Sequence, residues 1–249
     1  MTVLVVGSVR GGPGVTGTAL LLGGWLDDSV VAEADLDGGV VAIRYRLGRE
    51  PGLTTLAAAQ VPDPEGWRDH TQDAGGVAVL VGPDAPDRMA MLWSRAGRHL
   101  GPALAASTAS VVVDAGRLRF GDATSEPLAS ASLTLMLVRP VPEDLVGLAH
   151  RLPALQRAVD VAILLVGPGA YSPDDVSSEL GVDVLGVLPD DRRSTALLAA
   201  GGGSRGLART PLARAVRSVA DAVAARVGTG DPAAAGSRPT EKLAEEGIS

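Results

Sequence analysis

The amino-acid sequence predicts an α/β fold with a mostly parallel, seven- to eight-stranded sheet and helices on both faces. Three observations lead to this prediction. Short aliphatic runs recur along the chain and are continuously apolar rather than alternating, as expected of strands covered on both faces. Segments of helical character lie between most of these runs, and such alternation is typical of parallel crossover units. With 249 residues, 46% of them hydrophobic, the chain is long enough to bury a large core.

The elements can be placed in order along the chain. Seven strands are expected at Val3 to Val6, Val30 to Ala34, Val77 to Val81, Ser110 to Val113, Leu133 to Val138, Ala162 to Val166 and Val184 to Leu188. Helices are expected at Thr16 to Leu26, Pro86 to Leu104, Pro142 to Leu155 and Pro173 to Leu180. A last helix has Thr210 as its N-cap, Pro211 at its first position and one apolar stripe of Leu212, Val216, Val219, Val223 and Val227. We expect one domain over residues 1–228 and a disordered tail over 229–249, which is rich in Gly, Pro, Ala, Ser and Glu.

The composition excludes several classes of site. The chain has no cysteine, which excludes disulfides, thiolate catalysis and cysteine-ligated metals, and its three histidines are too scattered to predict a metal cluster. Aromatic residues make up 2% of the chain, which argues against binding bases or sugars on a row of rings. No apolar run approaches the roughly 20 residues of a membrane span, and the sequence opens into a strand-like run rather than a signal peptide. We therefore expect a cytoplasmic protein.

The most informative segment follows the first predicted strand. A glycine-rich loop leads into an apolar helix through Gly11, Gly12, Pro13, Gly14, Val15, Thr16 and Gly17. Backbone N–H groups and the helix N-terminus converge there, which favours phosphate. Gly12 to Gly17 also spells the dinucleotide fingerprint, with Asp35 placed for a ribose contact, so an NAD(P)-binding Rossmann oxidoreductase is an alternative. That fingerprint begins at the strand's end, whereas Gly12 lies six residues after Val6, which favours a phosphate-wrapping loop. A purely structural glycine turn is the third interpretation.

Several motifs together resemble those of one family. Arg10 to Thr16 resembles the deviant Walker A motif, K-G-G-x-G-K-[ST], of the MinD/ParA family of P-loop ATPases. Glu33 to Asp37 lies where this family carries its D-x-D switch, and Val111 to Gly116 resembles its Walker B strand. Leu137 to Pro140 is similar to the strand end that follows, and Gly186 to Asp191 to the G-x-x-P-x-D segment beside the adenine. The resemblance covers most of the chain and implies a MinD/ParA-like P-loop NTPase fold.

The resemblance implies roles for individual residues. ATP would contact Gly11, Gly12, Pro13, Gly14, Val15, Thr16, Gly17, Pro189 and Asp190. Thr16, Asp35 and Asp114 match the residues linked to Mg²⁺, and Asp37 matches the aspartate that positions water. The residues themselves leave local alternatives open. Asp35 and Asp37 are also suited to capping a strand-end turn, Asp114 to ending a strand, and Pro189 to Asp191 to a turn before the next helix.

The departures from the motif concern both of its lysines. The family's signature lysine, which reaches across a dimer, is Arg10 here, and the lysine that holds the β- and γ-phosphates is Val15. Lys242, in the tail, is the only lysine of the chain. Losing one phosphate-directed cation costs on the order of 10³-fold in phosphoryl transfer, whereas the loop amides still attract phosphate. We therefore predict nucleotide binding with weak or no ATP hydrolysis; the alternative is an active ATPase in which Arg10 acts as the catalytic cation.

Partners follow from the resemblance and from charge. The resemblance implies a homodimer that recruits a protein partner and acts as a positioning or assembly factor in partitioning, pilus or secretion machinery. Residues 192–226 carry seven arginines against the single carboxylate of Asp221. Nonspecific DNA binding is therefore a hypothesis for Arg192, Arg193, Arg205, Arg209, Arg214 and Arg217. The alternative is a solvated helix face on which Arg217 pairs with Asp221.

Overall fold

The computed structural model of the chain describes residues 2–10, 14–59, 64–118, 130–202 and 207–228. The predicted tail over 229–249 lies outside the described residues, and so do Gly11, Gly12, Pro13 and Arg205.

Eight strands form one sheet in the order β3-β4-β2-β5-β1-β6-β7-β8. Their bounds are β1 Val3–Ser8, β2 Ser29–Glu33, β3 Gln72–Asp73, β4 Ala78–Leu80, β5 Ser110–Arg117, β6 Leu133–Val138, β7 Val161–Val166 and β8 Val184–Leu188. All neighbours pair in parallel except β3 and β4. The predicted sheet is therefore confirmed, and the added eighth strand is the short antiparallel edge strand β3, whose two residues are too few for a periodicity to show.

The position of β1 in the sheet decides between two of the sequence interpretations. β1 lies between β5 and β6, and β5 separates it from β2. In a dinucleotide-binding Rossmann sheet the first strand pairs directly with the second. The sheet therefore lacks the strand order of a dinucleotide-binding Rossmann fold, on which the oxidoreductase alternative depends.

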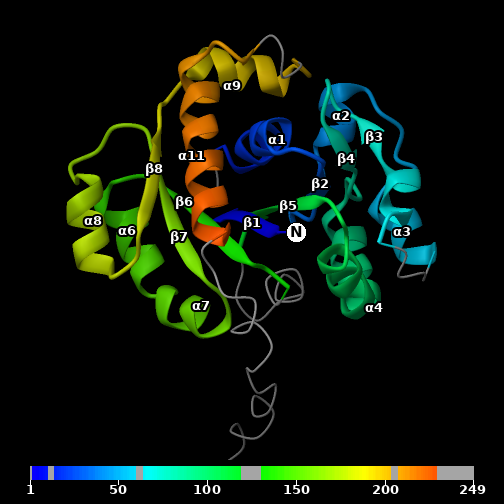
Figure 1. Cartoon of the computed structure of the whole chain (residues 1–249), viewed down its shortest axis with the longest axis horizontal. Coiled ribbons are helices and arrows are strands. Elements are labelled where there is room, and N and C mark those ends of the chain that lie inside the picture. Colours follow the sequence, from blue (N-terminus) through cyan, green and yellow to red (C-terminus); the bar gives the residue numbers. More distant parts are fainter. Residues whose placement is uncertain (1, 11–13, 60–63, 119–129, 203–206, 229–249) are drawn as a thin grey trace, which may run out of the picture.

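Two layers of helices cover the sheet. One face packs against α1 (Val15–Trp25), α2 (Val41–Tyr45), α9 (Arg192–Ala199) and α11 (Pro211–Gly228). The opposite face packs against α3 (Leu53–Ala59), the 3₁₀ helix η1 (Gly66–His70), α4 (Pro86–Ala105), α6 (Pro142–Ala149), α7 (Leu152–Ala158) and α8 (Pro173–Leu180). Figure 1 shows α1 and α11 side by side over the sheet. No helix among the described residues has both the length and the apolar character needed to cross a membrane.

Burial on both faces of the sheet explains why the sequence of β1 is apolar at successive positions. Val3 and Val5 belong to the core on the α4 side, whereas Leu4 and Val6 belong to the core on the α1 side. Successive side chains of a strand point to opposite faces, so a strand buried on both faces needs an apolar residue at every position.

Proline and threonine define two helix ends. The predicted helix from Pro142 to Leu155 is divided into α6 and α7, because Pro153 has no N–H to bond the carbonyl of Ala149 and its ring crowds that group. At the start of α11, the Thr210 hydroxyl accepts the Ala213 N–H at 3.2 Å, which confirms the predicted N-cap.

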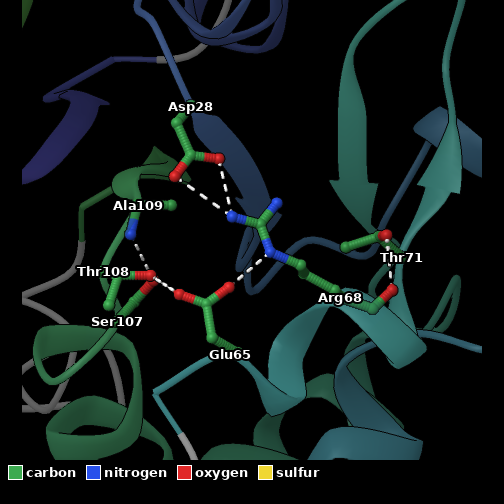
Figure 2. A network of polar contacts seen from close by, with 7 residues as sticks. All are labelled: Asp28, Glu65, Arg68, Thr71, Ser107, Thr108 and Ala109. Atoms are coloured by element: carbon green, nitrogen blue, oxygen red, sulfur yellow. Dashed lines mark hydrogen bonds and ion pairs between the residues drawn. The ribbon is translucent and has the colours of Figure 1, made fainter.

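A polar network joins three segments at the amino ends of the strands (Figure 2). Arg68 of η1 donates to Asp28, which precedes β2, at 2.8 and 3.1 Å, and to Glu65 at 2.5 Å. Glu65 also accepts the hydroxyl of Thr108, which precedes β5. These side chains are largely exposed and lie at the end of the sheet opposite the carboxyl ends of β1 and β5. The network therefore connects surface segments rather than forming part of the cleft described next.

Candidate functional site

A cleft of about 640 Å³ opens at the carboxyl ends of the central strands. Ligands of open α/β sheets bind in this place, where successive crossovers leave in opposite directions. Charged and hydroxyl side chains line the part near β1, β2 and β5, and apolar side chains line the part near β7 and β8, namely Val166, Pro168, Leu188, Leu198 and Leu212. The cleft therefore suits a ligand with one anionic end and one less polar end.

The start of α1 forms the floor of the charged part. Gly14 has φ of 82°, a left-handed conformation that favours glycine, and no side chain caps the helix. The first amides of α1 therefore have no helical acceptor and are free to donate to an anion. Gly14, Val15, Thr16 and Gly17 all line the cleft, as predicted for a phosphate site. Val15 also packs in the core and is 7% exposed, so it contributes apolar contact where the family motif has an ammonium group.

Asp114, in register with Val6 of β1, is buried beneath the cleft rather than lining it, and its carboxyl group faces the hydroxyl of the lining residue Thr16. Its Oδ1 accepts the Gly116 N–H at 3.2 Å, while its Oδ2 is buried with no hydrogen bond of normal geometry. Burial raises the pKa of Asp114 to about 7, the facing Thr16 hydroxyl lowers it, and the charges of Glu33 and Asp35 raise it. A buried carboxylate oxygen without a partner is costly, and a bound cation would satisfy it.

Asp35 and Asp37 both line the cleft from the segment between β2 and α2. Asp35 Oδ1 accepts the Asp37 N–H at 2.9 Å, and its carbonyl accepts the Gly38 N–H, so Asp35 closes a turn after β2, whereas no side chain caps the following helix α2. The Asp35 carboxyl lies against Gly116, whose φ is 54° and where a Cβ atom would lie 2.0 Å from Asp35 Cγ. Asp35 therefore reaches this position only because residue 116 is glycine.

Glu33 holds that segment from inside the protein. Its Oε1 accepts the N–H groups of Val40 and Val41 at 2.5 and 2.8 Å, and its Oε2 accepts the Gly82 N–H at 3.0 Å. The side chain is 1% exposed, and burial raises its pKa although these three N–H groups lower it. Glu33 thus holds the end of the segment that presents Asp35 and Asp37 and joins it to Gly82, which follows β4.

The segment after β8 reaches the cleft, whereas Arg10 does not line it. Pro189 and Asp190 line the cleft, as predicted. Asp191 caps α9 by accepting the Ser194 N–H at 3.0 Å and its hydroxyl at 2.6 Å, so the turn interpretation is also confirmed. Arg10 is exposed and lies 3.7 Å from Asp144 of α6, and it is not among the described residues that line the cleft.

Sequence reasoning missed three arginines that line the cleft. These are Arg44 of α2, Arg117 at the end of β5 and Arg139 directly after β6. Arg139 stands in the sequence within a motif-like strand end, and Arg117 follows the Walker B-like segment. Both residues could have been recognised as basic residues at the carboxyl end of a strand. The sequence does not show, however, that these strands are the neighbours of the strand before the glycine loop.

The residues at the site are suited to a magnesium ion that has only one or two protein ligands. Within the described ranges, no group of three or more His, Asp or Glu is arranged to hold a metal ion. Mg²⁺ usually binds through one or two carboxylates together with phosphate and water, rather than in an all-protein cage. The Thr16 hydroxyl and the unpartnered oxygen of Asp114 have the chemistry and the position for this type of site.

No protein-family model matches the chain, and no curated protein matches it in sequence. Solved structures do match over most of its length. The MinD cell division protein of Aquifex aeolicus aligns with a TM-score of 0.68 at 15% identity, over 93% of this chain and 99% of that one. MinD of Pyrococcus horikoshii, in complex with Mg-ADP, has a TM-score of 0.71 at 16% identity, over 91% and 97%. A ParA family ATPase of Chlorobium tepidum has a TM-score of 0.72 at 15% identity, over 88% and 97%. The chain therefore has the fold of the MinD and ParA P-loop ATPases.

Proposed function

We propose that the protein binds a magnesium nucleotide, ATP, and works as a MinD/ParA-like positioning or assembly factor with weak or no ATP hydrolysis. One observation carries the proposal: the uncapped start of α1 and the Thr16 hydroxyl line one cleft at the carboxyl end of β1, and the Thr16 hydroxyl faces the buried Asp114 beneath it. The similar MinD of Pyrococcus horikoshii was solved with Mg-ADP, which supports this choice of ligand.

Each part of the ligand has residues suited to it. The amides at Gly14 to Gly17 donate to the phosphates, and Thr16 and Asp114 hold Mg²⁺, which neutralises phosphate charge when bound. The apolar part of the cleft and the Pro189–Asp190 segment receive the base. Asp35 and Asp37 face the metal and phosphate region from the neighbouring turn.

Weak hydrolysis follows from the residue at the start of α1. Val15 is mostly buried in the core and offers no charge or donor to the transferred phosphate. Binding and catalysis depend on different groups, since the amides act on the ground state whereas the cation stabilises charge in the transition state. The site is therefore expected to bind ATP without turning it over efficiently.

Calorimetry with Mg-ATP tests this proposal on the native chain and on Val15→Lys. We expect the native chain to bind Mg-ATP and to show little phosphate release. We expect Val15→Lys to bind about tenfold or more tightly, because a charge-assisted contact contributes about 1.5–3 kcal/mol, and to gain measurable ATP hydrolysis. Thr16→Val, which removes the hydroxyl with little change of shape, is expected to weaken the magnesium-dependent part of binding. Absence of Mg-ATP binding by the native chain would contradict the proposal.

The proposed active unit is a homodimer that a protein partner recognises, in partitioning, pilus or secretion machinery. Arg10 supports the dimer, because its side chain is 59% exposed and is not among the described residues that line the cleft of its own subunit. If the chain is instead an active ATPase that uses Arg10, Arg10→Ala will abolish measured turnover.

DNA is the proposed anionic partner of the arginine-rich segment over residues 192–226. Five of its arginines are exposed on α9, α11 and the residues before α11, namely Arg192, Arg193, Arg209, Arg214 and Arg217. Arg217 lies over the Trp25 ring at 5.0 Å rather than pairing with Asp221, and Arg226 is engaged by Asp160 and Asp183.

Salt dependence tests the DNA hypothesis. We expect retention of the protein on nonspecific duplex DNA, with log affinity falling linearly against log salt at a slope of about −0.9 per phosphate contacted. The double variant Arg192→Ala/Arg193→Ala should reduce this slope, and Arg95→Ala on α4 should leave it unchanged. Retention that does not weaken as salt rises would argue against phosphate contacts.

A further inference from the structure

Two of the missed arginines stand on either side of the strand that leads into the glycine loop. β1 pairs with β5 on one side and with β6 on the other. Ser8, at the end of β1, is in register with Arg117 of β5 and with Leu137 of β6, and Arg139 follows two residues later. Neighbouring strands lie about 4.8 Å apart. The backbones of Arg117 and Arg139 are therefore about two strand spacings apart, and the path into the loop runs between them.

Both side chains are exposed and line the cleft, and neither forms an ion pair with another described residue. Arg10, Arg49, Arg68 and Arg226 each form an ion pair with an aspartate or glutamate. No such pair joins Arg117 or Arg139 to a carboxylate in the part of the chain that the structure describes, although aspartates line the same cleft. Two guanidinium groups on one cleft wall repel each other, so their placement favours an anion between them.

The chemistry of these residues matches what the start of α1 lacks. Val15 contributes no cation there, and the chain's only lysine, Lys242, lies outside the described residues. Arginine is permanently charged, and its planar fork of donors fits two phosphate oxygens at once. Arg117 and Arg139 line the cleft from the ends of β5 and β6, whereas a P-loop lysine stands at the start of the helix.

We propose that Arg117 and Arg139 hold the phosphate groups of the bound nucleotide and thereby replace the ammonium group missing at Val15. This inference deepens the function proposed above and rests on it for the identity of the ligand. Contacts of this kind hold phosphates in the ground state, so they maintain affinity for di- and triphosphates while leaving hydrolysis weak. The chain thus keeps a phosphate site with its cations moved from the helix to the two flanking strands.

Calorimetry with two separate probes, Mg-ATP and inorganic tripolyphosphate, tests the inference. The proteins are the native chain, Arg117→Ala, Arg139→Ala, the double variant, and Arg95→Ala as a control for loss of an exposed arginine. We expect each single variant to bind both probes about tenfold more weakly than the native chain, because each arginine makes a charge-assisted contact. The double variant should bind them about 100-fold more weakly, or more. Arg95→Ala should bind as the native chain does. Arg117→Lys and Arg139→Lys, which keep the charge, should recover part of the affinity.

The two probes separate this inference from the proposed function. Native Mg-ATP binding that is unchanged in the double variant overturns the inference and leaves the proposed function standing. Tripolyphosphate binding that the double variant loses, in a chain that does not bind Mg-ATP, supports the arginine site and overturns the proposed function. Binding of neither probe by the native chain overturns both. Thermal unfolding of each variant verifies folding, and if the double variant is unfolded the two single variants decide the result.

Discussion

Replacing Glu33 with alanine is expected to lower the free energy of unfolding by about 3–5 kcal/mol. The change leaves the N–H groups of Val40, Val41 and Gly82 without their acceptor in a buried position. Each unsatisfied buried donor costs about 1–3 kcal/mol, and the lost side chain also leaves a cavity. Urea denaturation at pH 7 measures this loss, and Mg-ATP affinity should fall with it because the turn carrying Asp35 and Asp37 is no longer held.

Two control variants show whether loss of the buried hydrogen-bond acceptor causes the fall in stability. Glu33→Gln keeps the shape of the side chain but replaces one acceptor oxygen with an amide NH₂ group. That group would face either the Gly82 N–H or the N–H groups of Val40 and Val41. The free energy of unfolding of Glu33→Gln should therefore lie between the values of the native chain and Glu33→Ala. Glu65→Ala removes a carboxylate from the exposed network of Figure 2, and a much smaller loss of stability is expected because exposed ion pairs contribute little. Equal losses for Glu33→Ala and Glu65→Ala would refute the buried role.

Replacing Asp114 with asparagine is expected to stabilise the ligand-free protein at pH 8 by about 2–4 kcal/mol. Burial is the main cause that raises the pKa of Asp114 to about 7, well above its ordinary value of 3.8. The native state therefore binds this proton more tightly than the unfolded chain does. The resulting stabilisation is fully present below pH 4 and is lost as the pH rises to about 7. Asparagine has no charge to bury and keeps an oxygen that accepts the Gly116 N–H.

Urea denaturation at pH 4 and pH 8 checks the sign of this effect. The stability difference between Asp114→Asn and native should be small at pH 4 and should favour the variant at pH 8. Asp87→Asn, on the exposed first turn of α4, is the control for loss of a surface carboxylate. An Asp114→Asn variant that is less stable than native at pH 8 would contradict the prediction.

The same substitution should remove the response to magnesium. An ionised, buried Asp114 is unfavourable in the empty protein, but it supplies the charge that a cation requires. Mg-ATP should therefore raise the melting temperature of the native chain more than that of Asp114→Asn. The expected trade of stability for binding is common at functional sites.

The type and order of the main elements, and the place of the glycine loop in the chain, follow from the sequence alone. Buried strands and amphipathic helices are local patterns, and Thr210, Pro211 and the α11 stripe can be recognised from a few neighbouring residues. Gly14, Thr16 and Asp35 lie after a strand or at the start of a helix, and Asp114 lies in the second half of β5, so a parallel sheet brings them to the same edge.

How distant segments meet in that cleft depends on tertiary packing. The place of β1 between β5 and β6 differs from the strand order of the dinucleotide fold and puts Arg117 and Arg139 on either side of the end of β1. The acceptor role of Glu33 depends on Gly82, which lies 49 residues away along the chain. Strand order and buried hydrogen bonds arise from packing between segments far apart in sequence, and no local periodicity encodes which segments become neighbours.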